Sequence, residues 1–353
     1  MKMHRRHFCR SILAAGAGGL IPFSFVTANK CRTGDINFSD SKIVKNNNSE
    51  SGYVKLHRSG ELRKRADVLW DMMAKCRICP RDCGANRLNN QKGDCNATSE
   101  MEVSSFSPHF GEEPPLVRKN GSGTVFFTNC SLLCVFCINW EISQGGMGQT
   151  RTVKELANMM LLLQRMGCHN INVVSPTHYI PHIMLALDEA VPAGLRIPLV
   201  YNTSGWEKIE ILQLLDGVVD IYLTDFKYFD SEMSDRYSPG ASSYPEITKK
   251  AVLEMHRQVG VADATPEKGI MSRGLIIRHL IMPNNVGGTS NVINWIAENL
   301  PENTYINIMS QYTPVFKANQ YPQIARRITR SEYNQALRAA RNAGLTNIDA
   351  QPI

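Results

Sequence analysis

The sequence predicts an α/β fold, either an incomplete barrel or a doubly wound sheet, with a cysteine-rich extension before it. Six apolar, often β-branched runs have the length of strands, and helix-like stretches alternate with them, as in a parallel sheet with buried strands. Apolar residues make up 43% of the 353 residues and charged residues 20%, which excludes wholesale disorder. No stretch approaches the roughly 18 consecutive apolar residues of a spanning helix, which excludes a multi-span membrane protein.

Residues 1–28 predict an export signal. A basic start precedes a Gly- and Ala-rich apolar stretch over 12–26, and small residues form a cleavage site ending at Ala28. The string His-Arg-Arg-His-Phe-Cys-Arg over residues 4–10 resembles the twin-arginine pattern. We therefore expect export by the twin-arginine route to the periplasm or the membrane surface. The alternative is an accidental arginine pair on a protein that stays in the cytoplasm.

Most of the net charge of +7 comes from this segment. Residues 1–28 hold four Lys and Arg residues and no acidic residue, so +3 remains on the rest. A near-neutral chain lacks the electrostatic footprint of a nucleic-acid-binding protein, and we expect no nucleic acid partner. We expect contact with a membrane only through the signal segment.

Three further segments follow the signal. Residues 29–60 are polar and predict a linker. Residues 61–118 predict one amphipathic helix followed by a cysteine-rich, turn-rich extension, and residues 119–353 contain the α/β core. The helix is indicated by apolar residues at helical spacing, namely Leu62, Ala66, Leu69, Trp70 and Met73.

The core elements alternate in a regular order. The expected strands are Thr124–Thr128, Ile171–Ser175, Ile197–Asn202, Ile221–Asp225, Leu275–Met282 and Tyr305–Met309. The expected helices lie near 152–167, 180–190, 207–215, 243–259, 288–299 and 330–343.

A cysteine triplet directly follows the first expected strand of the core. Cys130, Cys134 and Cys137 have the spacing C-x3-C-x2-C. A four-iron cluster normally takes four cysteines, so three would leave one iron open to a substrate or cofactor. Zinc sites and disulfides use even numbers of cysteines, and no histidine lies nearby in the sequence to complete a zinc tetrad. The triplet therefore predicts an open cluster site at the carboxyl end of a strand, where such folds place their chemistry.

With Phe136 just before its last cysteine, the triplet resembles the signature of the radical S-adenosylmethionine (SAM) superfamily. Within it the chain resembles the PflX-like homologues of pyruvate formate-lyase-activating enzyme, over about residues 70–345. That closer match is carried by His109-Phe-Gly-Glu-Glu-Pro-Pro115, Gly123-Thr-Val-Phe-Phe127, Asn139, Glu141-Ile-Ser-Gln144, Pro176-Thr-His178, Asp225-Phe-Lys227 and Ile308-Met-Ser-Gln-Tyr312. The resemblance implies a partial (β/α)6 barrel of the TIM type.

The resemblance also implies the cofactors. Cys130, Cys134 and Cys137 would hold a [4Fe–4S] cluster whose open iron chelates the amino and carboxylate groups of SAM. Phe136 would lie near the adenine. The segment Ser175-Pro176-Thr177 stands where the superfamily has a glycine-rich segment that meets the methionyl amine.

Three charged residues at strand ends complete the implied site. Lys227 and Arg278 are expected to bind the SAM carboxylate or ribose. Asp225 matches a carboxylate that helps to hold a cation near SAM in the activating enzymes. The companion position on the third strand is Asn202, where those enzymes have Asp.

The implied reaction is reductive cleavage of SAM to methionine and a 5′-deoxyadenosyl radical, which abstracts hydrogen from a bound substrate. It needs a low-potential electron donor, and the activating-enzyme likeness points to a partner protein or peptide as substrate. The alternative is a non-catalytic, exported iron–sulfur protein that carries electrons on the same scaffold.

A second cysteine group precedes the core. Cys76, Cys79, Cys83 and Cys95 have the spacing C-x2-C-x3-C-x11-C, a complete tetrahedral set. Structural zinc and an auxiliary iron–sulfur cluster fit it equally well. Two disulfides are the alternative, and C-x2-C pairs are commoner in metal sites than in strained local disulfides.

The remaining reactive side chains of the core are expected to be structural. Cys168 follows a helix and is interpreted as a buried core thiol. His178 and His279 lie at or within strands and are interpreted as satisfied structural histidines.

Overall fold

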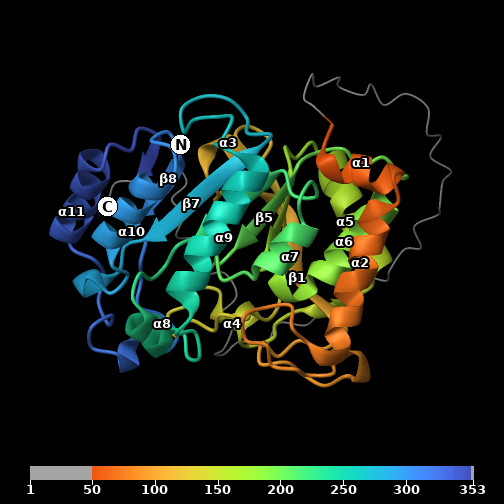
Figure 1. Ribbon diagram of the computed structural model, residues 1–353, viewed down its shortest axis with the longest axis horizontal. Helices are drawn as coiled ribbons and strands as arrows, with labels where there is room; N and C mark the ends of the chain where they lie inside the picture. The colour runs from red at the N-terminus through yellow and green to blue at the C-terminus, as the bar shows by residue number, and fades with distance from the viewer. Residues whose placement is uncertain (1–49, 351–353) are drawn as a thin grey trace, which may run out of the picture. The chain divides into compact units, whose positions relative to one another are not determined.

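A nine-stranded sheet organises residues 50–350, the part of the chain that the computed structural model describes (Figure 1). Its spatial order is β3-β1-β2-β4-β5-β6-β7-β8-β9. The strands are β1 Met101–His109, β2 Ser122–Phe127, β3 Gln149–Arg151, β4 Ile171–Val174, β5 Leu199–Thr203, β6 Ile221–Asp225, β7 Gly274–Leu280, β8 Tyr305–Met309 and β9 Ile348–Ala350.

The six strands β2, β4, β5, β6, β7 and β8 are parallel and stand in chain order, each beside the next. Helices run between them, so this part of the sheet is the predicted partial (β/α)6 barrel. β9 adds a seventh parallel strand after β8. At the other edge β1 pairs antiparallel with both β2 and β3.

The helices predicted for the core are present close to their expected bounds. They are α5 Val153–Arg165, α6 Ile180–Ala190, α7 Ile209–Leu214, α9 Tyr244–Val259, α10 Thr289–Asn299 and α11 Arg330–Asn342. Local chemistry fixes several starts: Thr152 and Thr329 form capping boxes with the glutamates three residues later, which satisfies helix N–H groups that lack partners. The further helices are α1 Gly52–Arg58, α2 Glu61–Asp71, α3 Pro114–Val117, α4 Trp140–Ser143 and α8 Ser231–Tyr237.

The predicted linker 29–60 is wrong at its end, because α1 occupies residues 52–58. Tyr53 and Val54 are fully buried, and the Tyr53 hydroxyl donates to the Ile197 carbonyl at 2.8 Å. Two anchoring side chains in a seven-residue helix are too few to produce a visible helical period. The signal predicted for residues 1–28 lies outside the described residues.

The extension predicted over 61–118 is continuous with the barrel sheet rather than a separate domain. The helix that was predicted at its start is present as α2. Its last part contains β1, which is hydrogen-bonded along β2 from Val103 to His109. The sequence of β1 shows no alternation of apolar and polar residues, because its side chains beyond Val103 are only partly buried or exposed.

The interior of the barrel separates an apolar floor from a polar end. Five strand residues form the floor: Val200, Ile221, Leu223, Ile276 and Tyr305. Leu116 and Val117 of α3 pack against them. Further along the same strands the inward side chains become polar, and the candidate site begins there.

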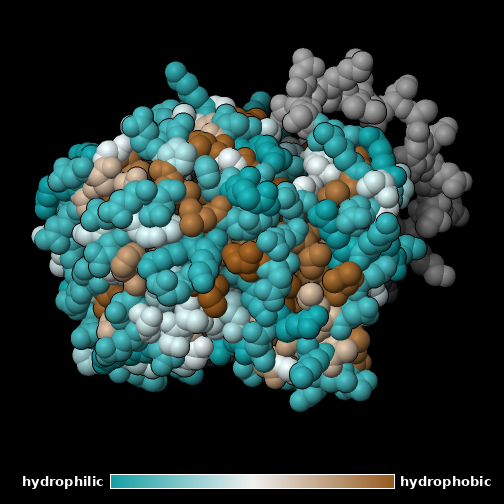
Figure 2. All heavy atoms as spheres, in the orientation of Figure 1, coloured by the Kyte–Doolittle hydropathy of each residue, from teal (hydrophilic) through white to brown (hydrophobic). Residues whose placement is uncertain are grey.

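The outer face that carries α7 and α9 is mainly hydrophilic, with scattered hydrophobic groups between the helices (Figure 2). Within residues 50–350 no helix has both the length and the apolar character needed to cross a bilayer.

Candidate metal and cofactor site

A cavity of about 270 Å³ lies at the carboxyl ends of the parallel strands. Its wall contains every core residue that the sequence nominated: Cys130, Cys134, Cys137, Phe136, Asp225, Lys227 and Arg278. These residues come from the loop after β2 and from the ends of β6 and β7. The fold thus brings together positions that are up to 148 residues apart in the chain.

Hydrogen-bond donors surround the three sulfurs of the cluster loop, residues 129–139. The Leu132 N–H donates to Cys130 Sγ at 3.4 Å, and the Ser238 hydroxyl donates to Cys134 Sγ at 3.1 Å. Cys137 Sγ lies 3.2 Å from Ser143 Oγ. Donors directed at sulfur stabilise thiolates and tune a metal that they bind.

Backbone hydrogen bonds from distant segments hold the cluster loop in place. The Val135 N–H donates to the Tyr237 carbonyl at 2.9 Å, and the Val135 carbonyl accepts from Lys317 N–H at 3.0 Å. The Gln144 amide donates to the Cys134 carbonyl at 2.9 Å. The loop is therefore fixed on three sides before any metal binds.

The donor set fits an iron–sulfur cluster. Burial raises the pKa of Cys134 to about 12 and also raises that of Cys137, so these thiols need a bound cation to ionise. No three His, Cys, Asp or Glu side chains within residues 50–350 are already drawn to the spacing of a single bound ion. Three thiolates suit a cluster that keeps one iron open better than a structural zinc site, which takes four protein ligands.

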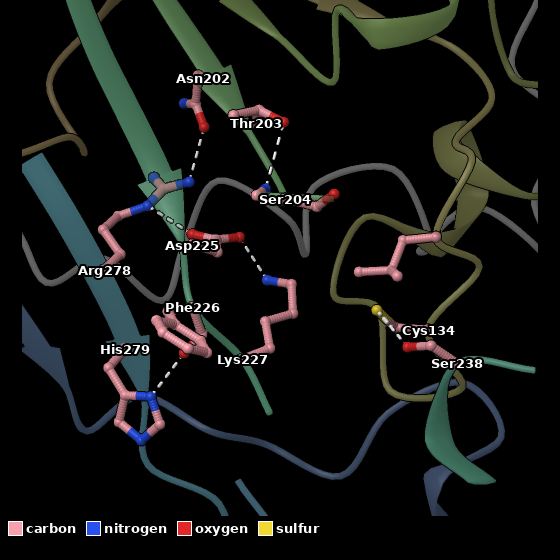
Figure 3. A network of polar contacts seen from close by, with 12 residues as sticks. Cys134, Asn202, Thr203, Ser204, Asp225, Phe226, Lys227, Ser238, Arg278 and His279 are labelled. Carbon is pink, nitrogen blue, oxygen red and sulfur yellow. Dashed lines mark hydrogen bonds and ion pairs between the residues drawn. The ribbon is translucent and has the colours of Figure 1, made fainter. Parts of the chain in front are cut away.

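Asp225 is held between two cations of the chain itself (Figure 3). Arg278 Nε donates to Asp225 Oδ1 at 2.8 Å, and Lys227 Nζ donates to Asp225 Oδ2. Burial opposes ionisation of this carboxyl, but the adjacent Arg278 and Lys227 outweigh it and lower the pKa of Asp225. The three groups are therefore charged together at the cavity wall.

The Arg278 guanidinium contacts Asp225, the residue beside which the resemblance implied a cation. Arg278 Nη2 donates to Asn202 Oδ1 at 2.6 Å, so its guanidinium bridges Asn202 and Asp225. Both carboxylate oxygens of Asp225 already accept from cationic nitrogens. The amide oxygen at position 202 thus serves as a neutral acceptor for the guanidinium.

Two further acids behind Arg278 were not identified from the sequence as site residues. Glu112 Oε2 lies 3.4 Å from Arg278 Nη1, and buried Glu113 accepts from Asn307 Nδ2 at 2.7 Å. Burial raises the pKa of Glu113 to about 7. The motif that starts at His109 was noted only for its resemblance, and its acids reach the barrel interior from the segment after β1.

The strand-end segment after β4 adopts the backbone that glycine would favour, although it contains none. Ser175 has φ of +55° and lines the cavity. Behind it, fully buried Glu207 accepts a hydrogen bond from the Thr177 hydroxyl at 2.6 Å and another from the Thr203 hydroxyl. Glu207 thereby ties the loop after β4 to the loop after β5.

The interpretation of the histidines and of Cys168 as structural is confirmed. Burial lowers the pKa of His178 to about 3 and that of His279 to about 4, so both rings are neutral. His178 Nε2 lies 2.8 Å from the Thr128 carbonyl. His279 lies between the Phe226 carbonyl at 2.7 Å and the Thr289 hydroxyl at 2.9 Å. Cys168 is buried in the core.

The second cysteine group gathers in the loop between α2 and β1. A Cβ atom on Gly93 would lie 3.3 Å from Cys83 Sγ and 3.5 Å from Cys95 Sγ, so those two sulfurs flank this glycine. Cys76, Cys83 and Cys95 all act electrostatically on Cys79. The eight cysteines of the described region are free thiols, and none of them is paired in a disulfide.

Comparisons with known proteins place this geometry among its relatives. Residues 124–262 match the family model described as "Radical SAM superfamily", a span that runs from β2 through the cysteine triplet to the end of α9. The chain is 33% identical over 291 residues to "Uncharacterized protein MJ0674" of Methanocaldococcus jannaschii, covering 80% of this chain and 78% of that protein. The crystal structure of methylornithine synthase (PylB) aligns with a TM-score of 0.41 and 15% identity, over 63% of this chain and 68% of that one.

Proposed function

The chain belongs to the radical SAM superfamily, and we propose that it is an enzyme that cleaves SAM reductively and abstracts hydrogen from a substrate. One observation carries the proposal: a single cavity is lined by the three cluster cysteines, by Phe136 and by the charged set Asp225, Lys227 and Arg278. Thiolates for iron, an aromatic face and cations for a carboxylate are the groups that a cluster and SAM require together.

A bound [4Fe–4S] cluster would supply the electron for reductive cleavage of SAM to methionine and a 5′-deoxyadenosyl radical, which would take hydrogen from the substrate. The residues of the chain would hold the cluster and orient SAM for this reaction. Cys130, Cys134 and Cys137 hold the cluster, with Ser238 donating to one of its sulfurs.

The charged wall orients SAM. The Lys227 ammonium has three N–H donors, of which Asp225 accepts one, so it is able to donate to a carboxylate oxygen in the cavity. Arg278 has less freedom, because Asp225 and Asn202 hold its guanidinium. We therefore assign the SAM carboxylate to Lys227 and a fixed positive potential to Arg278.

The substrate that we propose is a peptide segment of a partner protein, in line with the likeness to activating enzymes. An exposed apolar side chain of the cavity wall supports this proposal. Ile138 lines the cavity and is 68% exposed. The rings of Trp140 and Phe316 stack at 5.1 Å, which joins the start of α4, directly after the cluster loop, to the segment after β8. A macromolecule would cover such a surface more completely than a small molecule.

Product analysis tests the enzymatic proposal. After anaerobic reconstitution and addition of dithionite and SAM, the wild type should yield one 5′-deoxyadenosine for each methionine. Cys168→Ala should give the same yield as the wild type. Cys134→Ala should yield only background. A loaded, redox-active cluster without 5′-deoxyadenosine in the wild type would favour the alternative, an electron-transfer protein.

The proposed peptide substrate has a separate test. With a glycyl-radical protein as probe, the wild type should generate a protein-based radical detectable by electron paramagnetic resonance (EPR). Ile138→Asp should lose this signal and still cleave SAM in the absence of the probe. Probe-independent cleavage without any protein radical would point to a small-molecule substrate.

We also propose export by the twin-arginine route, since that route carries proteins folded around their cofactors. The support is the sequence of residues 1–28. The intact mass of the protein from cell fractions tests it, because a periplasmic form cut after Ala28 is expected. A full-length cytoplasmic form would contradict it.

A further inference from the structure

A buried arginine in the cysteine-rich loop lacks an obvious counter-charge. Arg87 is 0% exposed. Its Nε and Nη2 donate to the Thr98 carbonyl at 3.0 and 2.8 Å, which satisfies hydrogen bonds but supplies no negative charge. Among the residues that the structure describes, no carboxylate forms an ion pair with this guanidinium. An uncompensated buried charge costs several kcal/mol, so a partner of opposite charge is expected.

The groups available to balance Arg87 are thiols. Arg87 Nη1 lies 3.9 Å from Cys76 Sγ, and Cys95 is within Coulombic reach of the same guanidinium. Both cysteines belong to the group of four, in which Cys83 and Cys95 flank Gly93 and the other three cysteines act electrostatically on Cys79. A neutral thiol does not balance a guanidinium, whereas a thiolate does.

The charge of Arg87 favours a metal centre over two disulfides. Two disulfides would make all four sulfurs neutral and would leave Arg87 buried and unpaired. Four thiolates around Zn²⁺, or around a [4Fe–4S]²⁺ cluster, carry a net charge of −2, which Arg87 offsets in part. The bridge at Nη1 then becomes a charge-assisted hydrogen bond to a metal-bound sulfur.

The four-cysteine loop also contacts the first site. Arg81, between Cys79 and Cys83, donates through Nε to the Ser131 carbonyl and through Nη2 to the Pro239 carbonyl at 2.9 Å. Ser131 directly follows Cys130, so an arginine of one cysteine group fixes the backbone of the other. Figure 1 shows the loop, in orange, beside α4, at the end of the barrel that carries the cavity.

We propose that Cys76, Cys79, Cys83 and Cys95 bind a second, closed tetrathiolate metal centre, that Arg87 is its buried counter-charge, and that Arg81 couples it to the cluster loop. The centre fixes the loop that carries Arg81, and this loop in turn supports the site at Cys130. The inference is independent of SAM cleavage, because it rests on groups outside the cavity.

Metal analysis of a protein that lacks the first site tests the proposal. The triple variant Cys130→Ala, Cys134→Ala, Cys137→Ala should retain one tightly bound centre per chain after anaerobic purification. One zinc without iron identifies a zinc site. Iron and sulfide in equal amounts, with absorption near 400 nm, identify a cluster. A triple variant that holds no metal, and in which Cys76, Cys79, Cys83 and Cys95 resist alkylation in denaturant until a reductant is added, would establish the disulfides and overturn the proposal.

Substitution of the counter-charge tests the role of Arg87. In the triple-variant background, Arg87→Met should weaken retention of the metal against a chelator by about tenfold or more, as outer-shell changes typically do. Arg87→Lys should retain most of the affinity. Arg196→Met, at an exposed arginine that also donates to backbone carbonyls, is the control and should leave metal retention unchanged. Equal retention in Arg87→Met and in the control would refute the assignment of the counter-charge.

The coupling through Arg81 has its own readout. In otherwise wild-type protein, Arg81→Met should accelerate loss of iron from the Cys130 site under chelator, while the metal of the second centre is retained. Unchanged iron loss would show that the two sites are independent.

Discussion

Asp225→Asn removes the carboxylate that contacts both Lys227 and Arg278. Lys227 then loses its ion-pair partner, whereas Arg278 Nη1 still lies 3.4 Å from Glu112 Oε2. The side chains of Asp225, Arg278 and Lys227 are only 11%, 15% and 16% exposed, so solvent screens them weakly. Asparagine still accepts from Arg278 at one oxygen. Its amide group then faces the Lys227 ammonium, which sets donor against donor.

The expected size of this effect follows from the burial of the set. Breaking a buried ion pair by removing one partner costs about 3–5 kcal/mol, because the remaining charge is left without compensation. A surface pair is the natural comparison. Asp216 lies 2.6 Å from Arg257, with side chains 41% and 57% exposed, and the loss of such a pair costs at most about 1 kcal/mol.

Urea unfolding of the two variants under identical metal loading measures the difference. Asp225→Asn should lower the free energy of unfolding by at least about 2 kcal/mol more than Asp216→Asn. SAM should raise the melting temperature of Asp225→Asn more than that of the wild type, because its carboxylate supplies the missing negative charge. Equal destabilisation by the two substitutions would refute the assignment of Asp225 as the counter-charge of Lys227 and Arg278.

Three further predictions concern groups around the same cavity. Burial raises the pKa of Glu113 from its ordinary value of 4.5 to about 7, so the stability that its neutral form contributes is complete below pH 4.5 and is lost as the pH rises through 7. Glu113→Gln should therefore lose less stability than the wild type between pH 5 and pH 8, by about 1–3 kcal/mol in urea unfolding, and identical pH profiles would contradict this. Ser238→Ala removes the hydroxyl donor to Cys134 Sγ and should lower the midpoint potential of the cluster by tens of millivolts in an EPR redox titration, with Ser231→Ala, whose side chain is not bonded to a cluster sulfur, as the unchanged control. Phe136→Leu should weaken SAM binding roughly tenfold in equilibrium dialysis, since an aromatic face against a base contributes about 1–3 kcal/mol; unaltered affinity would remove Phe136 from the adenine site.

The barrel could be predicted from the sequence because parallel strands that are buried on both faces appear as short, continuous apolar runs. β6 and β8 lie at their predicted bounds, and so does α6. The strand β1 was missed because serines and a proline interrupt its pattern, and it is recognised only through its pairing with β2. The helix α1 is too short to show a period.

The cluster cysteines could be predicted because their spacing is local. The contacts that tune the site are distant in the chain and leave no local pattern. Glu112 meets Arg278 across 166 positions, and Ser238 meets Cys134 across 104. Arg87 shows the same limit, because an arginine in a polar loop is ordinarily exposed, and only the folded loop shows that it is buried beside Cys76.

The central claim is that one cavity holds both a three-cysteine cluster and SAM. EPR spectroscopy of the reduced, reconstituted wild-type protein with and without SAM tests it most directly, with the triple variant Cys130→Ala, Cys134→Ala, Cys137→Ala recording any signal from the second cysteine group. We predict that SAM changes the part of the wild-type spectrum that the triple variant lacks, and that the spectrum of the triple variant does not respond to SAM. A cluster signal at this site that is identical with and without saturating SAM would contradict the account.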